Sequence, residues 1–220
     1  MTLEKTLIIT LDDFVYDFYS IKKDIWERIA QDNQLQLPEH FIMSWYDAHL
    51  EKREKLGREH PKLAPYFNEV ESQFQTYLQS NKESIQFIPN HIEYLTQWSK
   101  IYKLVYCTNL KIDSMRDLLK STEFPLEVDI LVSSKQVLNA KPEGDIYLKI
   151  ARLLGIKANT LTIIDSTLNG IQASYLANSK GLYLAQFHEA NSTIRKFAYA
   201  HFKQSDELNH YVLNLINQSE

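Results

Sequence analysis

The residues best suited to chemistry in this sequence stand where apolar runs end. Four such runs are followed directly by carboxylate, hydroxyl or amide side chains: Asp12 and Asp13, Thr108 and Asn109, Ser133, and Asp165 and Ser166. Carboxylates bind metal ions or move protons, and backbone amides at the start of a helix bind anions. These residue types indicate a ligand site, provided that the fold brings the four segments together.

The sequence alternates between strand-like and helix-like segments after residue 88. Apolar runs of strand length predict strands at 7–11, 103–107, 128–132, 160–164 and 181–187. Helical spacing predicts helices at 91–99, 114–119, 145–154, 169–178 and near 206–217. This alternation predicts an α/β fold with a doubly wound, Rossmann-like parallel sheet. Ligands bind beyond the carboxyl ends of the strands in such a sheet, which is where the polar residues stand.

The stretch 16–84 has no strand pattern and is expected to be entirely helical. Its first helix is indicated by apolar residues at helical spacing: Phe18, Ile21, Ile25, Trp26 and Ile29. A second helix is predicted from about Glu39 past Trp45 and Leu50, and a third from Pro65 to Tyr77. We therefore predict an α/β core of residues 1–15 and 85–220, with an inserted all-helical cap of residues 16–84.

Composition and charge exclude several classes of protein. The chain has 220 residues, of which 44% are hydrophobic and 24% are charged, as in ordinary globular proteins. Its single cysteine, Cys107, cannot form an internal disulfide, so we expect a reducing, cytoplasmic setting. The short apolar stretch near the N-terminus ends directly in Asp12 and Asp13, so we expect no signal peptide. The net charge of −4 argues against a nucleic-acid partner. No apolar run approaches the roughly 18 residues that would predict a membrane span.

Four motifs in a fixed order give the sequence a family resemblance. They are the segment 10–15 (TLDDFV), Thr108 with Asn109, Lys141 before Pro142, and the segment 165–170 (DSTLNG). This series resembles the motifs of the haloacid dehalogenase superfamily. The closest likeness is to its β-phosphoglucomutase-like phosphatases, whose helical cap follows the first motif. The resemblance covers essentially the whole chain, and the segments 141–145 and 165–170 are its most specific parts.

The resemblance implies a role for each motif. In that family the first motif reads D-x-D-G-T, where the first aspartate attacks phosphorus and the second serves as acid and base. A magnesium ion screens the charge, while the second and third motifs hold phosphate oxygens. On this sequence the resemblance places Asp12 at the acid/base position. It places Thr108, Asn109 and Lys141 at the phosphate-binding positions.

The first and fourth motifs depart from the family pattern. Thr10 stands at the nucleophile position, Asp13 at the glycine and Phe14 at the threonine, while Ile164 replaces the first acidic residue of the fourth motif. A threonine hydroxyl is a weak nucleophile without an adjacent base, so we expect an inactive or nearly inactive phosphatase site. If Asp12 were instead aligned with the nucleophile, Phe14 would take the acid position and one catalytic aspartate would still be missing.

The same departures weaken the expected metal site. Magnesium prefers an octahedral shell of oxygens that usually includes one or two carboxylates. Asp165 and the backbone carbonyl of Asp12 still offer oxygens, but two carboxylates of the family's site are missing. We predict that Mg²⁺ binds weakly, if at all, and we expect no other cofactor.

The retained residues also have purely structural interpretations. Lys141 could be a solvated loop lysine, and Thr108 and Asn109 could cap the helix that follows them. Capping is compatible with phosphate binding, because amides at a helix N-terminus bind anions. The seven histidines show no metal-binding spacing, and Cys107 is expected to be an inert core thiol.

Three functional hypotheses follow. The first is a pseudoenzyme with a phosphatase fold that binds a small phosphorylated ligand or a protein partner in the cleft between core and cap. The second is a magnesium-dependent phosphohydrolase of small phosphorylated metabolites, whose remodelled site recruits Asp13 or Asp17. The third is a dimerisation or scaffold module. The loss of the nucleophile beside retained phosphate-binding residues favours the first.

Overall fold

The computed structural model of the chain describes residues 5–215. Six strands form one sheet in which every neighbouring pair is parallel: β1 (Thr6–Thr10), β2 (Lys103–Thr108), β3 (Leu131–Ser133), β4 (Thr162–Asp165), β5 (Lys180–Leu184) and β6 (Ala200–Phe202). Their order is β3-β2-β1-β4-β5-β6, so β1 lies in the interior with β2 and β4 beside it. The predicted doubly wound parallel sheet is confirmed.

Helices cover both faces of this sheet. One face packs against α5 (His91–Trp98), α6 (Ile112–Ser121) and α10 (Ser205–Asn214), and the other against α7 (Asp145–Leu154), α8 (Leu168–Leu176) and α9 (Ser192–Phe197). The alternation of side chains along β1 produces this division. Leu7 and Ile9 belong to the first cluster, whereas Ile8 belongs to the second with Ile150 of α7. The central strand is therefore buried on both faces, as its continuous apolar sequence predicts.

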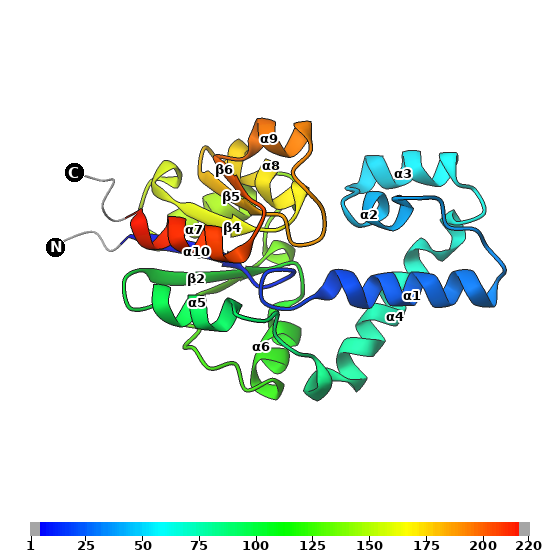
Figure 1. The fold of residues 1–220 in the computed structure, drawn as a ribbon, viewed down its shortest axis with the longest axis horizontal. Helices are drawn as coiled ribbons and strands as arrows, with labels where there is room; N and C mark the ends of the chain where they lie inside the picture. The colour runs from blue at the N-terminus through cyan, green and yellow to red at the C-terminus, as the bar shows by residue number, and fades with distance from the viewer. Residues whose placement is uncertain (1–4, 216–220) are drawn as a thin grey trace.

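Four helices between β1 and α5 stand beside the sheet (Figure 1). They are α1 (Phe18–Asp32), α2 (Phe41–Tyr46), α3 (Leu50–Glu59) and α4 (Phe67–Ser80), with single 3₁₀ turns at Ala64–Tyr66 and Lys82–Ser84. Trp26 of α1 is fully buried, and its ring makes edge contacts with Phe41, Trp45 and Phe67. These aromatic contacts hold the helices in the arrangement that was expected for the cap. The exact domain boundaries remain a prediction.

The second predicted cap helix is wrong as a single element. It divides into α2 and α3, because Asp47 ends α2 and His49 adopts an extended backbone (φ −74°, ψ 174°) before α3 begins.

Several strand and helix limits near the C-terminus also differ from the prediction. β3 covers Leu131–Ser133, so it begins three residues later and ends one residue later than the predicted strand 128–132, and β5 ends at Leu184 instead of residue 187. The short elements α9 and β6 were not predicted, since six and three residues are too few to show a period. The last helix ends at Asn214, and residues 216 and 217 of its predicted range lie outside the described residues.

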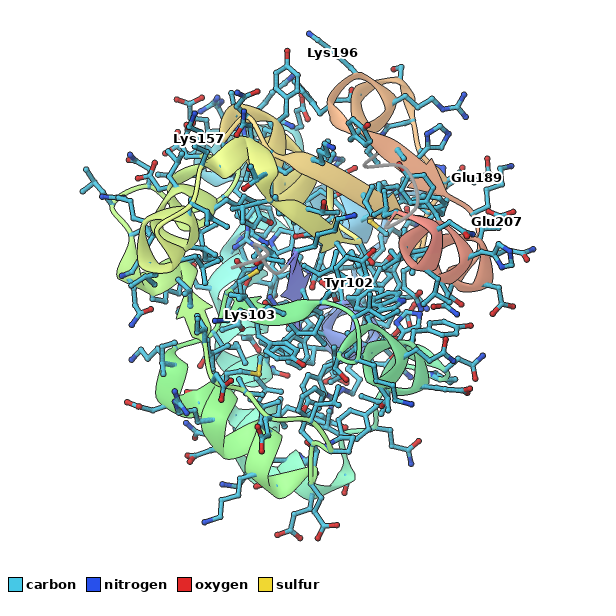
Figure 2. The ribbon with its side chains drawn as sticks, turned by 90° about the vertical axis from the view of Figure 1, so that its left-hand side faces the viewer. Tyr102, Lys103, Lys157, Glu189, Lys196 and Glu207 are labelled. Atoms are coloured by element: carbon cyan, nitrogen blue, oxygen red, sulfur yellow. The ribbon has the colours of Figure 1, made fainter. Side chains whose placement is uncertain are left out.

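The periphery of the core is charged. Turned by 90°, the molecule shows the side chains of Lys157, Lys196 and Glu207 at its edge (Figure 2), and all three residues are exposed. Within residues 5–215, no helix is both long and apolar enough to cross a membrane.

The segment that leads into α7 packs tightly on α8, and this contact generates a prediction. A Cβ atom at Gly144 would lie 2.8 Å from the backbone nitrogen of Ala177, which cannot move as a flexible side chain would. We expect Gly144→Ala to destabilise the protein by about 1–3 kcal/mol in urea unfolding. The matched control is Gly57→Ala in α3, where the nearest atom lies at 3.4 Å and a small gain in stability is expected. Equal effects of the two substitutions would contradict the tight contact.

Candidate functional site

The polar residues singled out in the sequence meet at one edge of the sheet. Thr10, Thr108, Ser133 and Asp165 are the last residues of β1, β2, β3 and β4, which lie side by side in the order β3-β2-β1-β4. All four are buried. The expectation that the strand ends would bring these segments together is confirmed.

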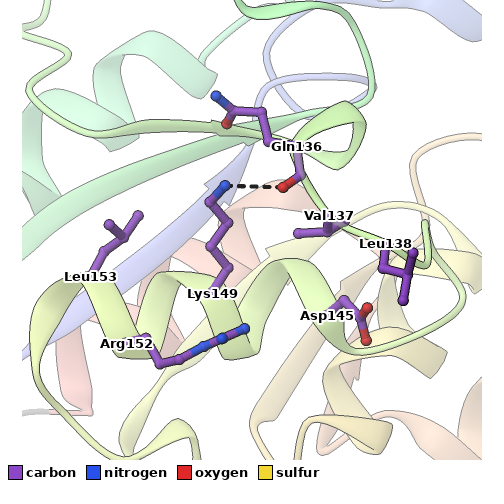
Figure 3. Close-up of a pocket in the computed structure, with 7 residues that line it drawn as sticks. All are labelled: Gln136, Val137, Leu138, Asp145, Lys149, Arg152 and Leu153. Atoms are coloured by element: carbon purple, nitrogen blue, oxygen red, sulfur yellow. Dashed lines mark hydrogen bonds between the residues drawn. The ribbon is translucent and has the colours of Figure 1, made fainter.

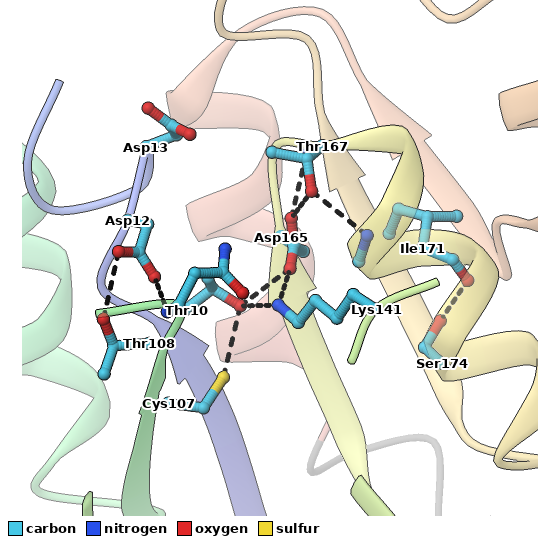
Figure 4. Close-up of polar contacts among 12 residues, drawn as sticks. Thr10, Asp12, Asp13, Cys107, Thr108, Lys141, Asp165, Thr167, Ile171 and Ser174 are labelled. Atoms are coloured by element: carbon cyan, nitrogen blue, oxygen red, sulfur yellow. Dashed lines mark hydrogen bonds and ion pairs between the residues drawn. The ribbon is translucent and has the colours of Figure 1, made fainter. Parts of the chain in front are cut away.

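Asp165 is the hub of this edge (Figure 4). Its Oδ2 accepts hydrogen bonds from Lys141 Nζ at 2.7 Å, Thr10 Oγ1 at 2.8 Å and the Tyr147 hydroxyl at 3.3 Å. Its Oδ1 accepts from the backbone nitrogen of Thr167 at 2.8 Å and from the Thr167 hydroxyl at 2.7 Å. The carboxylate thus receives five hydrogen bonds from its own chain, and its side chain is completely buried.

The ion pair between Lys141 and Asp165 is almost fully removed from water. The Lys141 side chain is 4% exposed, so the solvated loop lysine considered above is wrong. Burial by itself would raise the pKa of Asp165, but Lys141 and the donated hydrogen bonds outweigh it, and the pKa lies below its ordinary value. Burial would lower the pKa of Lys141, but Asp165 raises it well above the ordinary value. Both groups are therefore charged at neutral pH.

The start of α8 is shaped around Asp165. Thr167 is the N-cap of this helix, and its hydroxyl accepts a hydrogen bond from the backbone nitrogen of Gly170 at 3.1 Å while it donates to Asp165. A Cβ atom at Gly170 would lie 1.8 Å from Asp165 Oδ2. The glycine of the DSTLNG segment is needed here because the carboxylate packs directly on its Cα atom.

Asp12 lies between β1 and β2 and is held by the second motif. Its Oδ1 accepts from the Thr108 hydroxyl at 3.0 Å, and its Oδ2 accepts from the backbone nitrogen of Asn109 at 2.7 Å. Burial raises the pKa of Asp12, against the opposing effects of the Asn109 amide and the charge of Lys141. Two of the three residues expected to hold phosphate, Thr108 and Asn109, therefore already hold a carboxyl group of the chain.

The alternative in which Thr108 and Asn109 cap the next helix is wrong. The N-cap of α6 is Lys111, and no side chain makes a capping hydrogen bond there. Thr108 Oγ1 instead accepts from the backbone nitrogen of Leu110 at 3.0 Å, inside the turn that follows β2. This bond fixes the hydroxyl so that its own hydrogen points at Asp12.

Asp13 takes the glycine position of the first motif and keeps a backbone conformation typical of glycine. Its φ is +64°, which a side chain adopts at a cost and aspartate tolerates better than most. Its carboxyl group is buried and receives hydrogen bonds from the Tyr46 hydroxyl and, at 2.9 Å, from the backbone nitrogen of Tyr19. Burial raises the pKa of Asp13 to about 8.

The other substituted positions are filled by apolar packing. Phe14 is fully buried, and its ring stacks on the His91 ring with centroids 4.4 Å apart. Ile164 is also fully buried, within the cluster that lies between the sheet and α5. Asp17, which the phosphohydrolase hypothesis recruits, is the N-cap of α1 and accepts from the Ser20 amide at 2.8 Å.

Asp145, from the KP…D segment, lies away from this cluster. Its Oδ2 accepts from the backbone nitrogen of Asn139 at 3.1 Å and from the Asn139 side chain at 3.2 Å. It lines a hollow of about 450 Å³ between η3 (Ser134–Gln136) and α7, where Lys149 Nζ donates to the Gln136 carbonyl at 3.0 Å (Figure 3). The role of Asp145 in this structure is to hold the loop before α7.

Sequence reasoning missed four side chains that complete the site. In the sequence, Tyr147 lies within the predicted helix 145–154 and Thr167 within the segment 165–170, and neither was assigned a role. Cys107, expected to be an inert core thiol, is buried beside the site with its Sγ 3.4 Å from Thr10 Oγ1, and burial raises its pKa to about 11. Tyr46 comes from the cap. A single hydroxyl or thiol group gives no periodic signal in the sequence, so only the fold could place these groups.

The cluster contains few groups free to bind a metal ion. Within residues 5–215, no three side chains of His, Cys, Asp or Glu are placed together to hold one. The buried Ser166 hydroxyl has no hydrogen-bond partner among the described residues. Of the two predicted metal ligands, the Asp165 carboxylate is hydrogen-bonded within the chain. The other is the backbone carbonyl of Asp12, and the hydrogen bonds from Thr108 and Asn109 go to the Asp12 side chain instead.

Comparison with known proteins gives a consistent match. A family model described as haloacid dehalogenase-like hydrolase matches residues 9–183. Among curated proteins, none matches the chain significantly.

Solved structures resemble the chain over nearly its whole length. A hydrolase from Pseudomonas syringae is 17% identical with a TM-score of 0.72, over 97% of this chain and 99% of that one. A conserved haloacid dehalogenase-like protein from Agrobacterium tumefaciens is 14% identical with a TM-score of 0.77, over 97% and 100%. A HAD family hydrolase from Deinococcus radiodurans, solved with bound phosphate and sodium, is 17% identical with a TM-score of 0.71, over 93% of each chain. At these identities the likeness shows the fold alone.

The buried ion pair generates a prediction about stability. Lys141→Met should cost about 3–5 kcal/mol in urea unfolding, because it leaves the buried Asp165 carboxylate without its counter-charge. The double variant Lys141→Met/Asp165→Asn should lose less than the single variant, since no unpaired charge remains buried. Lys203→Met, which removes an exposed pair with Glu189 at 3.0 Å, serves as the control and should leave the stability nearly unchanged, because water screens the exposed charges. A double variant less stable than Lys141→Met would contradict this account.

Proposed function

The chain belongs to the family of haloacid dehalogenase-like hydrolases, and we propose that it has lost hydrolysis and binds a phosphate-bearing small molecule between core and cap. The observation that carries this proposal is the state of Asp165. Its carboxylate, which an active site would direct at a metal ion, is neutralised by Lys141 and receives five hydrogen bonds from its own chain. The acidic residue of the fourth motif is thus bonded to groups of the protein itself.

Thr10 is poorly placed to serve as a substitute nucleophile. Its hydroxyl donates to Asp165 at 2.8 Å, so a base is adjacent in the geometric sense. The pKa of that carboxylate is lowered, however, and a carboxylate of low pKa is a weak base at neutral pH. Lys141 Nζ also donates a hydrogen bond to Thr10 Oγ1 at 3.4 Å. This bond occupies a lone pair of the hydroxyl oxygen and makes that oxygen a weaker nucleophile. The Thr10 hydroxyl thus bridges the Asp165 carboxylate and the Cys107 thiol by hydrogen bonds.

The residues present do not fit the magnesium ion that the family generally uses. The nucleophile position supplies a hydroxyl that is already bonded, and Ile164 supplies no ligand atom. Asp165 could ligate a metal only by giving up hydrogen bonds that stabilise its buried charge. Magnesium dehydrates reluctantly and demands near-ideal octahedral geometry, so such an exchange is unfavourable. We infer weak Mg²⁺ binding at most and assign it no step.

The phosphate part of the proposal rests on how the second motif holds Asp12. The Thr108 hydroxyl and the Asn109 amide already form an anion cradle, with the Asp12 carboxyl group in the place where a phosphate oxygen would sit. A phosphate-bearing ligand would compete with Asp12 for these two donors. The similar protein from Deinococcus radiodurans contains bound phosphate, which supports an anion site in this fold.

The alternative, a magnesium-dependent phosphohydrolase with a remodelled site, has less support. It would recruit Asp13 or Asp17, but Asp17 caps α1 and the Asp13 carboxyl group is bonded to Tyr46 and Tyr19. Neither lies in a position where it could replace the carboxylate lost at Thr10 without breaking those bonds.

Restoring the two lost carboxylates tests the loss of hydrolysis. We expect no turnover above background from the wild-type protein in a screen of small phosphate esters with Mg²⁺. Thr10→Asp/Ile164→Glu should gain Mg²⁺-dependent turnover, because it restores a charged nucleophile and a metal ligand beside intact phosphate donors. Adding Asp12→Asn should abolish that gain. Wild-type turnover that Asp12→Asn abolishes would refute the proposal.

Removing the internal anion tests the phosphate site. Asp12→Ala should tighten the binding of inorganic phosphate about tenfold or more in calorimetric titration, since a charge-assisted hydrogen bond is worth about 1.5–3 kcal/mol. Asp145→Asn, which changes a carboxylate away from the cradle, is the control and should leave phosphate binding unchanged. If phosphate, vanadate and sugar phosphates raise the melting temperature of neither protein, the ligand is not a phosphate compound and the scaffold hypothesis gains support.

A further inference from the structure

The hollow beside α7 is a surface feature that the strand-end site does not use. One wall is the segment after η3, with Val137 and Leu138, and the other is the outer side of α7, with Lys149, Arg152 and Leu153 (Figure 3). Its volume is about 450 Å³, and all of its lining residues lie between positions 136 and 153 of the core. The hollow is therefore formed without the cap and without any residue of the Asp165 cluster.

Large apolar side chains are exposed around this hollow. Leu138 is 93% exposed and Leu153 is 59% exposed, and the exposed Leu148 lies on α7 one turn before Arg152. The core does not need these leucines, because another side of α7 already supplies a complete buried stripe: Ile146, Tyr147, Ile150 and Ala151. Exposed apolar side chains that gather around one hollow mark a place where another molecule binds.

Hydrogen bonds hold the wall that carries Leu138 in place. The backbone nitrogen of Asn139 donates to Asp145 Oδ2 at 3.1 Å, and the Asn139 side chain donates to the same oxygen at 3.2 Å. Lys149 Nζ donates to the Gln136 carbonyl at 3.0 Å and so joins the two walls. The segment on both sides of Leu138 is thus fixed before any partner arrives, which lowers the entropy lost on binding.

The charge in the hollow is positive and has no internal counterpart. Lys149 and Arg152 stand three residues apart on α7, so they share one side of the helix. In the part of the chain that the structure describes, neither forms an ion pair with a carboxylate. Asp145 also lines the hollow, but its Oδ2 accepts from Asn139. Two unpaired cations beside exposed leucines, on a chain of net charge −4, complement a surface that is both apolar and acidic.

The shape of the hollow selects among the molecules with such a surface. The wall from Asp145 to Leu153 runs along roughly 12 Å of helix, at about 1.5 Å per residue, which suits about two turns of a partner helix. A bilayer surface cannot enter a concave hollow. A second copy that paired through this face about a two-fold axis would bring Lys149 and Arg152 against their own equivalents, and like charges repel.

We propose that this hollow, which we call the α7 hollow, is a docking site for an acidic amphipathic helix of a partner protein. Apolar side chains of that helix fill the space between Leu138 and Leu153, and its carboxylates bind Lys149 and Arg152. This is the helix-in-groove mode of recognition. The proposal goes beyond the phosphate site and does not rest on it, because the two sites share no residue.

The test uses a helical peptide of alanine, leucine and glutamate labelled with fluorescein. Its leucines and glutamates are each repeated at four-residue spacing, which places them on two adjacent sides of the helix. Two matched peptides carry lysine in place of every glutamate, or serine in place of every leucine. In fluorescence anisotropy with the full chain and no phosphate, we expect the first peptide to bind about tenfold or more tightly than either matched peptide. Added salt should weaken this binding, because it screens the exposed charges.

Removal of the two lining leucines tests the apolar half of the site. Leu138→Gln/Leu153→Gln should weaken binding of the acidic peptide about tenfold or more, since the central apolar contacts of an interface carry most of its affinity. The matched control is Leu50→Gln/Leu176→Gln, which changes two exposed leucines of α3 and α8. This control should bind the peptide as the parent does.

Reversal of the two charges tests the polar half. Lys149→Glu/Arg152→Glu should lose the acidic peptide and gain the lysine peptide, a change of preference that an unfolded variant cannot produce. Lys180→Glu/Lys196→Glu makes the same change of net charge at two exposed lysines outside the hollow, and it should keep the parent's preference.

Four results would overturn the proposal. The first is a parent chain that does not bind the acidic peptide, and the second is equal binding by the parent and by Leu138→Gln/Leu153→Gln. The third is a parent dimer in sedimentation velocity that this variant dissolves, because a second copy would then cover the hollow. The fourth is parent binding to vesicles of phosphatidylcholine and phosphatidylglycerol that this variant abolishes. Since phosphate is absent throughout, failure of the proposed phosphate site would leave all four measurements unaffected.

Discussion

The buried ion pair between Lys141 and Asp165 constrains the positions of the side chains around it. Two charges removed from water would be costly, and that cost is offset only when they are close and their remaining hydrogen bonds are satisfied. The structure meets this requirement with Thr10 from β1, Tyr147 from α7 and Thr167 from the start of α8. The ends of two strands and two helices are therefore fixed by the need to satisfy one carboxylate.

The same constraint supports the proposed loss of hydrolysis. In a site built for hydrolysis, the charges of the strand ends are directed at a ligand, whereas here they compensate one another inside the protein. Asp12 repeats this arrangement on the other side of Thr10, since it occupies the donors of Thr108 and Asn109. Next to Asp12, the buried Asp13 side chain accepts a hydrogen bond from Tyr46 of the cap. Three carboxyl groups thus accept hydrogen bonds from donors of the chain itself, and in the proposed function a phosphate-bearing ligand competes with Asp12 for its donors.

Much of the fold was predictable from the sequence, because the interactions that create it are periodic. The alternation along β1 and the helical spacing along α7 each reflect burial on a defined face, and burial leaves a regular apolar pattern. The parallel topology then placed Thr10, Thr108 and Asp165 at one edge without any further information. The limits of prediction were the short elements. The break at Asp47 and the three-residue strand β6 are set by tertiary contacts and leave no period in the sequence.

The sequence by itself determined which functional groups this protein has: a hydroxyl at residue 10 in place of a carboxylate, an apolar side chain at residue 164, and a lysine at residue 141. Only the tertiary structure decided what each group binds. The Tyr147 hydroxyl reaches Asp165 from 18 residues away in sequence, and the Tyr46 hydroxyl reaches Asp13 from 33 residues away. The physical reason is that residue type fixes charge and hydrogen-bonding capacity, whereas direction and desolvation depend on neighbours that the folded chain alone brings together.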